Sequence, residues 1–144
     1  MTDWASDVAT EAVSGRGREP VEASRVTLDV SGGAVVVQWS LSYDVDTIVD
    51  RGPGNRFPVA QVEAIAALER NGVEIARWTL GEDRVQAAQG AMARARLTGT
   101  ASALFVDRVP GFGRKTYVLK VWNERARRYG TVTLGTRAMI CEKR

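Results

Sequence analysis

The chain has 144 residues, of which 44% are hydrophobic and 26% charged, a size and composition that fit one globular domain and exclude a disordered or fibrous protein. The net charge of +3 comes from interleaved basic and acidic residues, so no long field of one sign favours a nucleic acid. The sequence shows neither a long apolar membrane span nor a secretory signal pattern. We therefore expect a protein that stays in the cytosol of its producer and contacts no membrane.

Two residue types limit the chemistry. Histidine is absent, so the chain lacks the commonest general base near neutral pH and the commonest metal ligand. Cys141 is the only cysteine, and it lies in an apolar strand pattern, which predicts a small core residue and no intrachain disulfide. We expect no enzyme and no cofactor.

Residues 1–24 differ from the rest of the chain and predict an N-terminal arm and linker. Trp4, Val8 and Ala12 recur at a spacing of four, which favours a short helix over about residues 2–13. A helix of that length is marginal alone. It would need a neighbouring subunit or a partner protein to hold it, and the alternative is a disordered start. Residues 14–20 are rich in glycine and arginine and read as a linker.

From Arg25 onward the hydrophobic pattern has a period of two, which predicts strands in a single domain over residues 25–144. Strands are expected over 26–30 and 35–43, joined by a tight turn at Ser31-Gly32-Gly33. Residues 44–58 carry several glycines and prolines, and they predict a long connection. Asn71-Gly72 is the preferred pair of a type I′ turn, so it predicts a hairpin between residues 62–68 and 73–78. The alternative is a helix ending at Gly72.

The remaining segments extend the same pattern. Strands are expected over 101–107, 115–122 and 129–142, separated by a Pro-Gly turn and a basic turn at 123–128. Residues 85–97 give only a weak signal. About eight short strands with glycine- and proline-bearing turns predict an all-β fold, an antiparallel β-sandwich or barrel.

Three aspartates are the candidate metal ligands. Asp44, Asp46 and Asp50 stand at the start of the predicted connection, and oxygen-rich loops can hold Ca²⁺. Their spacing matches no EF-hand. The competing interpretations are a solvated polar loop and a paired-carboxylate hydrolase site.

A second candidate site surrounds the basic turn before the last strand. Its residues are Arg125, Arg127, Arg128 and Tyr129. The guanidinium groups of the three arginines could bind an anionic group, or they could simply keep a sheet edge soluble. Trp39 lies on an apolar strand face and predicts a core residue. Trp122 lies on the face opposite its apolar neighbours, which makes it a candidate for an interface or a ligand contact.

One stretch resembles a known family. The strand at 103–107 runs into Asp107, Pro110, Gly111 and Gly113, where proline fixes φ and the glycines allow positive φ, and then into the strand at 115–121. Together with the closing segment 130–140, this resembles the jelly-roll domains of bacteriophage tail-fibre, tail-spike and head-fibre proteins. The resemblance implies a jelly-roll sandwich in a virion structural protein, commonly a homotrimer, assembled in the cytoplasm of a bacterial host. Outer loops would contact the host surface.

The sequence therefore carries three hypotheses. The first is a spike, decoration or fibre-tip component of a phage or phage-like particle, with residues 2–20 attached to a capsid or tail protein. The second is a carbohydrate-binding module that holds a glycan, with or without Ca²⁺. The third is an enzyme that uses carboxylates, which the lack of histidine disfavours.

Overall fold

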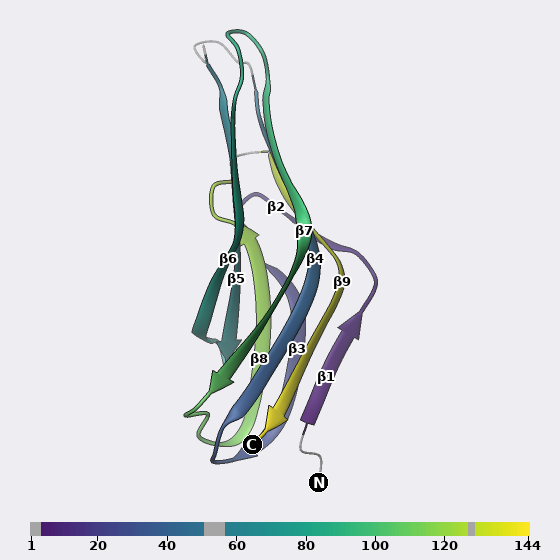
Figure 1. Ribbon diagram of the computed structural model, residues 1–144, viewed down its shortest axis with the longest axis vertical. Coiled ribbons are helices and arrows are strands. Elements are labelled where there is room, and N and C mark those ends of the chain that lie inside the picture. Colours follow the sequence, from purple (N-terminus) through teal and green to yellow (C-terminus); the bar gives the residue numbers. More distant parts are fainter. Residues whose placement is uncertain (1–3, 51–56, 127–128) are drawn as a thin grey trace.

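The computed structural model describes residues 4–50, 57–126 and 129–144, and every regular element in these ranges is a β-strand. The strands form two antiparallel sheets that pack face to face as a sandwich (Figure 1). None of the described segments forms a helix long and apolar enough to cross a membrane. The end of β4, the start of β5, the end of β6 and the start of β7 project together beyond the rest of the sandwich (Figure 1).

The strand order is that of a jelly roll. The five-stranded sheet has the order β1-β9-β4-β7, with β2 also paired to β9. The four-stranded sheet has the order β3-β8-β5-β6. If β1 and β2 are counted as one interrupted strand, the chain has eight strands in the orders 1-8-3-6 and 2-7-4-5, which is a jelly-roll arrangement. The predicted fold class is therefore confirmed. The strands are β1 (Trp4–Ala9), β2 (Val13–Arg16), β3 (Val21–Ser31), β4 (Val35–Val49), β5 (Val59–Arg70), β6 (Val73–Gln86), β7 (Ala93–Asp107), β8 (Phe112–Asn123) and β9 (Tyr129–Lys143).

The core lies between the two sheets and follows the alternation seen in the sequence. On β4, Val35, Val37, Trp39 and Leu41 point inward and are buried. Trp39 packs edge to face against Trp78 of β6, with 5.1 Å between ring centroids. Trp39 is therefore a core residue, as predicted.

The Asn71-Gly72 turn joins β5 and β6 as predicted. Both residues have positive φ, 50° and 84°, which is the requirement of a type I′ turn. Arg70 pairs directly with Val73 across it. The helix alternative for residues 59–70 is wrong, because β5 lies between β8 and β6 and hydrogen-bonds to both. Tertiary pairing thus overrides the helix propensity of its alanines and glutamates.

The short helix predicted near the N-terminus is also wrong, because residues 4–9 form β1. β1 pairs antiparallel with β9, from Trp4 opposite Glu142 to Ala9 opposite Arg137. A spacing of four residues is even, so it places Trp4 and Val8 on one face of a strand as well as of a helix. Part of the predicted linker is likewise a strand, since β2 pairs with β9 from Val13 to Arg16.

The connection predicted over residues 44–58 begins later than expected. β4 continues through Asp44 and Asp46 to Val49, because the intervening Val45 and Thr47 are buried and extend the alternation. Aspartate favours turns in isolation, and the sequence prediction followed that preference. Residues 51–56 of the predicted connection lie outside the described residues.

The buried thiol leads to a first prediction. Cys141 is fully buried, and burial raises its pKa to about 12. The pKa of an unfolded cysteine is about 8.5, so this group favours folding below that pH, and its contribution is lost as pH rises toward the folded value. We expect the native thiol to be inert to thiol reagents until the chain is denatured. Above roughly pH 9 the free energy of unfolding should fall, and fall less steeply in Cys141→Ala. Rapid labelling of the native thiol near neutral pH would contradict this.

Candidate functional site

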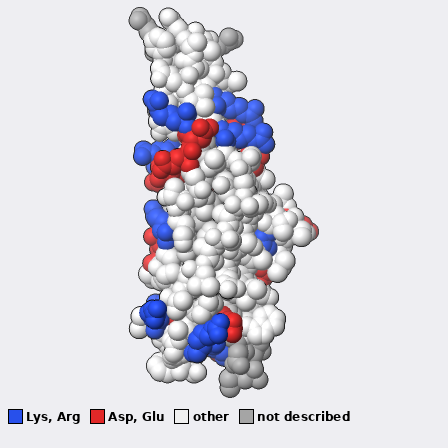
Figure 2. Space-filling view, viewed as in Figure 1, with Lys and Arg blue, Asp and Glu red and all other residues white. Residues whose placement is uncertain are grey.

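The outer surface of the five-stranded sheet carries two rows of uncharged side chains. The register places Ser6, Ile140, Gln38 and Leu104 side by side across β1, β9, β4 and β7. The next row places Val8, Ala138, Ser40 and Ser102 side by side across the same strands. We call the surface formed by these eight residues the neutral face. Figure 2 shows it as a broad uncharged area in the middle of the molecule.

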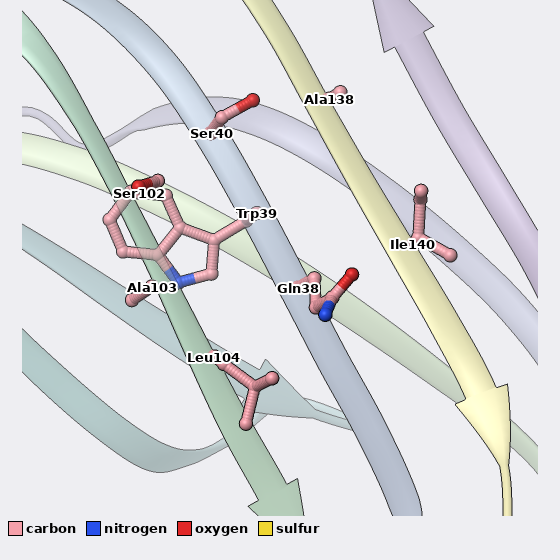
Figure 3. Close-up of a pocket in the computed structure, with 8 residues that line it drawn as sticks. All are labelled: Gln38, Trp39, Ser40, Ser102, Ala103, Leu104, Ala138 and Ile140. Atoms are coloured by element: carbon pink, nitrogen blue, oxygen red, sulfur yellow. The ribbon is translucent and has the colours of Figure 1, made fainter.

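Large apolar side chains gather on the neutral face. Val8 is 67% exposed, Leu104 56% and Ile140 41%, and Trp4 lies at its edge with 56% exposed. Between β7, β4 and β9 the surface is hollowed by a shallow pocket of about 460 Å³ (Figure 3). Val8 and Ile140 lie on neighbouring strands, and Gln38 separates Ile140 from Leu104. An uncharged surface with several exposed apolar side chains is a candidate contact site.

A charged belt bounds the neutral face at the end where β4 and β7 extend toward the projection. Arg94 donates two hydrogen bonds to Asp46, through Nε at 3.0 Å and Nη2 at 2.7 Å. Arg96 binds Asp44 in the same way, at 3.0 and 2.7 Å. The hydrogen bonds from Arg96 hold the pKa of Asp44 below its usual range. Two of the three candidate metal ligands are therefore engaged by guanidinium groups.

The third candidate, Asp50, follows the end of β4. In the part of the chain that the structure describes, no three acidic or cysteine side chains are grouped to hold a metal ion. The aspartates thus lie in and after an ion-paired strand, and the structure does not bring them together as a ligand set.

This arrangement leads to a second prediction. Millimolar Ca²⁺ should leave the melting temperature unchanged, because the carboxylates of Asp44 and Asp46 are already paired with arginines. Asp46→Ala should lower the free energy of unfolding by less than about 1 kcal/mol, because its partner Arg94 is half exposed to water. Differential scanning calorimetry with and without Ca²⁺ tests both statements. Stabilisation by Ca²⁺ in the unmodified chain that is absent in Asp46→Ala would contradict them.

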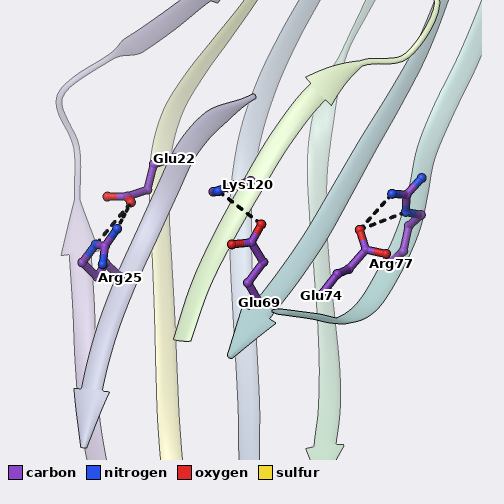
Figure 4. Close-up of polar contacts among 6 residues, drawn as sticks. All are labelled: Glu22, Arg25, Glu69, Glu74, Arg77 and Lys120. Atoms are coloured by element: carbon purple, nitrogen blue, oxygen red, sulfur yellow. Dashed lines mark hydrogen bonds and ion pairs between the residues drawn. The ribbon is translucent and has the colours of Figure 1, made fainter. Parts of the chain in front are cut away.

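The outer surface of the four-stranded sheet is different, because it is covered by ion pairs. Arg25 contacts Glu22 at 2.6 Å, Lys120 contacts Glu69 at 3.2 Å, and Arg77 contacts Glu74 at 2.9 Å (Figure 4). The two broad surfaces of the sandwich therefore have opposite character. The four-stranded sheet is covered by internally paired charges, and the five-stranded sheet carries the neutral face, with the ion pairs of Asp44 and Asp46 beyond it.

Two of the residues predicted around the basic turn, Trp122 and Arg125, lie at the end of the four-stranded sheet and contact side chains of their own chain. The Trp122 Nε1 donates to Glu124 at 2.5 Å, a bond that lowers the pKa of Glu124. The Arg77 guanidinium lies 5.1 Å from the centre of the Trp122 ring. Arg125 pairs with Glu63 at 3.0 Å. Tyr129 begins β9 and is 47% exposed, and Arg127 and Arg128 lie outside the described residues.

The turn between β7 and β8, whose residues resemble those of phage jelly-roll domains, is held in place by a buried polar network. Asp107 is buried and accepts a hydrogen bond from the Tyr117 hydroxyl at 2.8 Å. It also accepts two from one nitrogen of Arg70, at 2.7 and 2.8 Å. Burial and the bond to Asp107 raise the pKa of Tyr117. Gly111 and Gly113 have positive φ, 83° and 95°, as predicted for the turn. These residues therefore hold the fold together.

Comparison with known proteins gives only distant similarities. No family model matches the chain, and no curated protein matches its sequence. Among solved structures it is similar to the C-terminal domain of EclA, a sugar-binding protein, with TM-score 0.41, 17% identity and coverage of 92% of this chain and 79% of that one. It is also similar to PliG, a periplasmic inhibitor of g-type lysozyme from Aeromonas hydrophila, with TM-score 0.34, 16% identity and coverage of 95% and 86%.

A third similar structure is the CBM22-1 xylan-binding domain of Paenibacillus barcinonensis Xyn10C, with TM-score 0.35, 16% identity and coverage of 98% and 83%. The chain is thus a β-sandwich domain that distantly resembles sugar-binding and carbohydrate-binding domains. None of these three structures is described as a phage protein. At this level of similarity they assign no ligand to the chain.

Proposed function

We propose that this chain is a non-catalytic structural module that assembles with copies of itself through the neutral face. The observation that carries the proposal is the contrast between the two outer surfaces of the sandwich. Ion pairs cover the four-stranded sheet, whereas Val8, Leu104 and Ile140 stand exposed among small uncharged side chains on the five-stranded sheet. The cores of protein interfaces are depleted of charged residues in the same way.

A second copy is the occupant that this surface fits best. A surface covered by internal ion pairs gains little from meeting its own copy, because its charges would lose water without gaining new partners. The eight residues of the neutral face carry no charge, so two copies can approach without that cost. The exposed apolar side chains then supply the favourable free energy when water is excluded.

We propose that the assembly is a spike, decoration or fibre-tip component of a phage or phage-like particle. The resemblance implies a homotrimer, whereas a neutral face that meets the neutral face of a second copy makes a two-fold contact and gives a dimer. The support is the resemblance of residues 103–121 and 130–140 to phage jelly-roll domains. The network of Asp107, Tyr117 and Arg70 gives the residues of that resemblance a physical role. Trp4 and Val8, which the sequence singled out for attachment to a capsid or tail protein, lie along the margin of the neutral face.

A glycan-binding module is the second candidate. The shallow pocket of about 460 Å³ offers the amide of Gln38 and the hydroxyls of Ser40 and Ser102, which can hydrogen-bond a sugar. It lacks an exposed aromatic platform, because Trp39, the one aromatic residue in its lining, is only 3% exposed. Sugar sites that use aromatic stacking need an accessible ring. The pocket therefore favours this candidate less than self-assembly.

Two valine substitutions test the proposal as a matched pair. Val8 is 67% exposed on the neutral face, and Val73 is 64% exposed beside the Asn71-Gly72 turn. We expect Val8→Lys to lower the mass of the assembly in light scattering and Val73→Lys to leave it unchanged. Equal effects of the two lysines would reject the neutral face as the interface. Melting temperatures measured with a panel of oligosaccharides test the second candidate in the same samples.

A further inference from the structure

Each sheet of the sandwich ends in two edge strands, and three of these four edges carry features that oppose pairing with another strand. The edge opposite β7 is divided between β1, with 6 residues, and β2, with 4. The pairing of β3 with β8 shifts in register between Glu22 and Ser24, and β3 carries three charged residues. β6 has five charged residues, and its pairing with β5 is shifted twice.

The fourth edge, β7, carries none of these features along most of its length. It pairs with β4 residue by residue, from Ala93 opposite Val49 to Asp107 opposite Val35, without a register shift. Residues 97–106 contain no charged residue and no proline. Within the described residues, β7 pairs with no strand on its other side. A long, regular and uncharged edge of this kind is a template for another strand.

We propose that β7 pairs in antiparallel orientation with β7 of a second copy. The partner strand must itself be regular and uncharged, and β7 is the one edge in the described part of the sandwich with both properties. If the pair is centred on Ala101, residues 97–105 of both copies meet without any charge. Arg94 and Arg96, just beyond, are already bound by Asp46 and Asp44.

Edge pairing would also enlarge the neutral face. Ser102 and Leu104 of β7 belong to that face, so joining two β7 strands makes the neutral faces of the two copies continuous. The combined sheet would have the order β1-β9-β4-β7-β7-β4-β9-β1. This inference rests on the proposed self-assembly, but it names a different contact, and one copy can make both.

Hydrogen exchange measured residue by residue tests the edge contact. In an antiparallel strand the amides point alternately to the two neighbours. Those of β7 that point away from β4 are protected only if another strand is present. In the Val8→Lys variant, whose neutral face is blocked, we expect a dimer in which residues 98–104 are protected without alternation. On dilution to monomer, every second amide should exchange about tenfold faster or more.

Proline substitutions provide the matched pair. Successive N–H groups of a strand point to opposite sides. One of the variants Ala101→Pro and Ser102→Pro therefore removes an N–H that hydrogen-bonds to β4, and the other removes an N–H at the free edge. We expect one variant to lose stability and the other to keep a near-native melting temperature. Combined with Val8→Lys, the stable one should be monomeric. If both prolines unfold the chain, the exchange experiment on the Val8→Lys variant decides alone.

The outcomes separate this inference from the proposed function. An unmodified oligomer whose β7 amides alternate between fast and slow exchange would overturn edge pairing and leave the neutral face standing as the interface. A Val8→Lys variant that retains the mass of the unmodified protein and full β7 protection would support the edge and reject the face. A chain that is monomeric at every concentration would overturn both.

Discussion

Replacing Asp107 with alanine is expected to lower the free energy of unfolding by about 3 kcal/mol, because it leaves a partly buried guanidinium and a buried hydroxyl without their acceptor. The Asp107 side chain is 5% exposed, and that of its partner Arg70 is 25% exposed. Tyr117 is fully buried, so no water can replace the lost hydrogen bond without local opening. Urea denaturation followed by fluorescence measures the change.

The control for Asp107→Ala is Asp46→Ala. Both aspartates bind an arginine through two hydrogen bonds, but the Arg94 partner of Asp46 is 53% exposed. Burial is therefore the main difference between the two pairs. A double-mutant cycle with Tyr117→Phe separates the hydroxyl bond from the ion pair. Losses of stability that agree within about 0.5 kcal/mol for the two alanine variants would contradict a buried anchor at the β7–β8 turn.

Removing residues 1–20, so that the chain begins at Val21, is expected to lower the free energy of unfolding by about 3 kcal/mol and the melting temperature by roughly 10 °C, because β1 and β2 are lost. Ala5 and Val13 pack against the core. The Asp7 carboxylate accepts a hydrogen bond from the backbone N–H of Arg25 at 3.1 Å. The buried Arg137 donates to the carbonyl of Glu11 at 2.5 Å. The deletion removes all of these contacts and uncovers the edge of β9.

Addition of a peptide of residues 1–20 provides the control for this truncation. If β1 and β2 act as sheet strands, the peptide should restore part of the lost stability by pairing with β9, and a peptide with Val13→Asp should restore less. A truncated chain with the melting temperature of the intact protein would contradict this account. It would mean that residues 1–20 are an arm, as the sequence suggested, and that the sandwich is complete without them.

The sequence predicted those parts of the fold that depend on local patterns. The alternation around Trp39, the Asn71-Gly72 turn and the buried strand that holds Cys141 need no knowledge of distant residues. β1 was missed because its apolar spacing suits two structures and its partner β9 lies more than a hundred residues away. β4 was cut short because Asp44 and Asp46 resemble turn residues until Arg96 and Arg94 are placed beside them.

The candidate site could not be predicted because it exists only after four strands are set in register. Ser40 and Ser102 are unremarkable in the sequence, and their significance comes from lying opposite each other with Ala138 and Val8. Arg70 was missed for the same reason, since its partner Asp107 is 37 residues away. The available signal was the lack of charge at alternate positions of residues 36–42 and 98–106. It gains meaning only by contrast with the charged strands of the other sheet.

The molar mass of the unmodified chain, measured by light scattering across a dilution series, tests the central claim most directly. Self-assembly through the neutral face predicts a mass of several chains at about 100 µM that falls toward the mass of one chain on dilution. A mass of one chain at every concentration would contradict self-assembly through the neutral face. Together with a rise in melting temperature caused by an oligosaccharide, that result would favour the glycan-binding candidate.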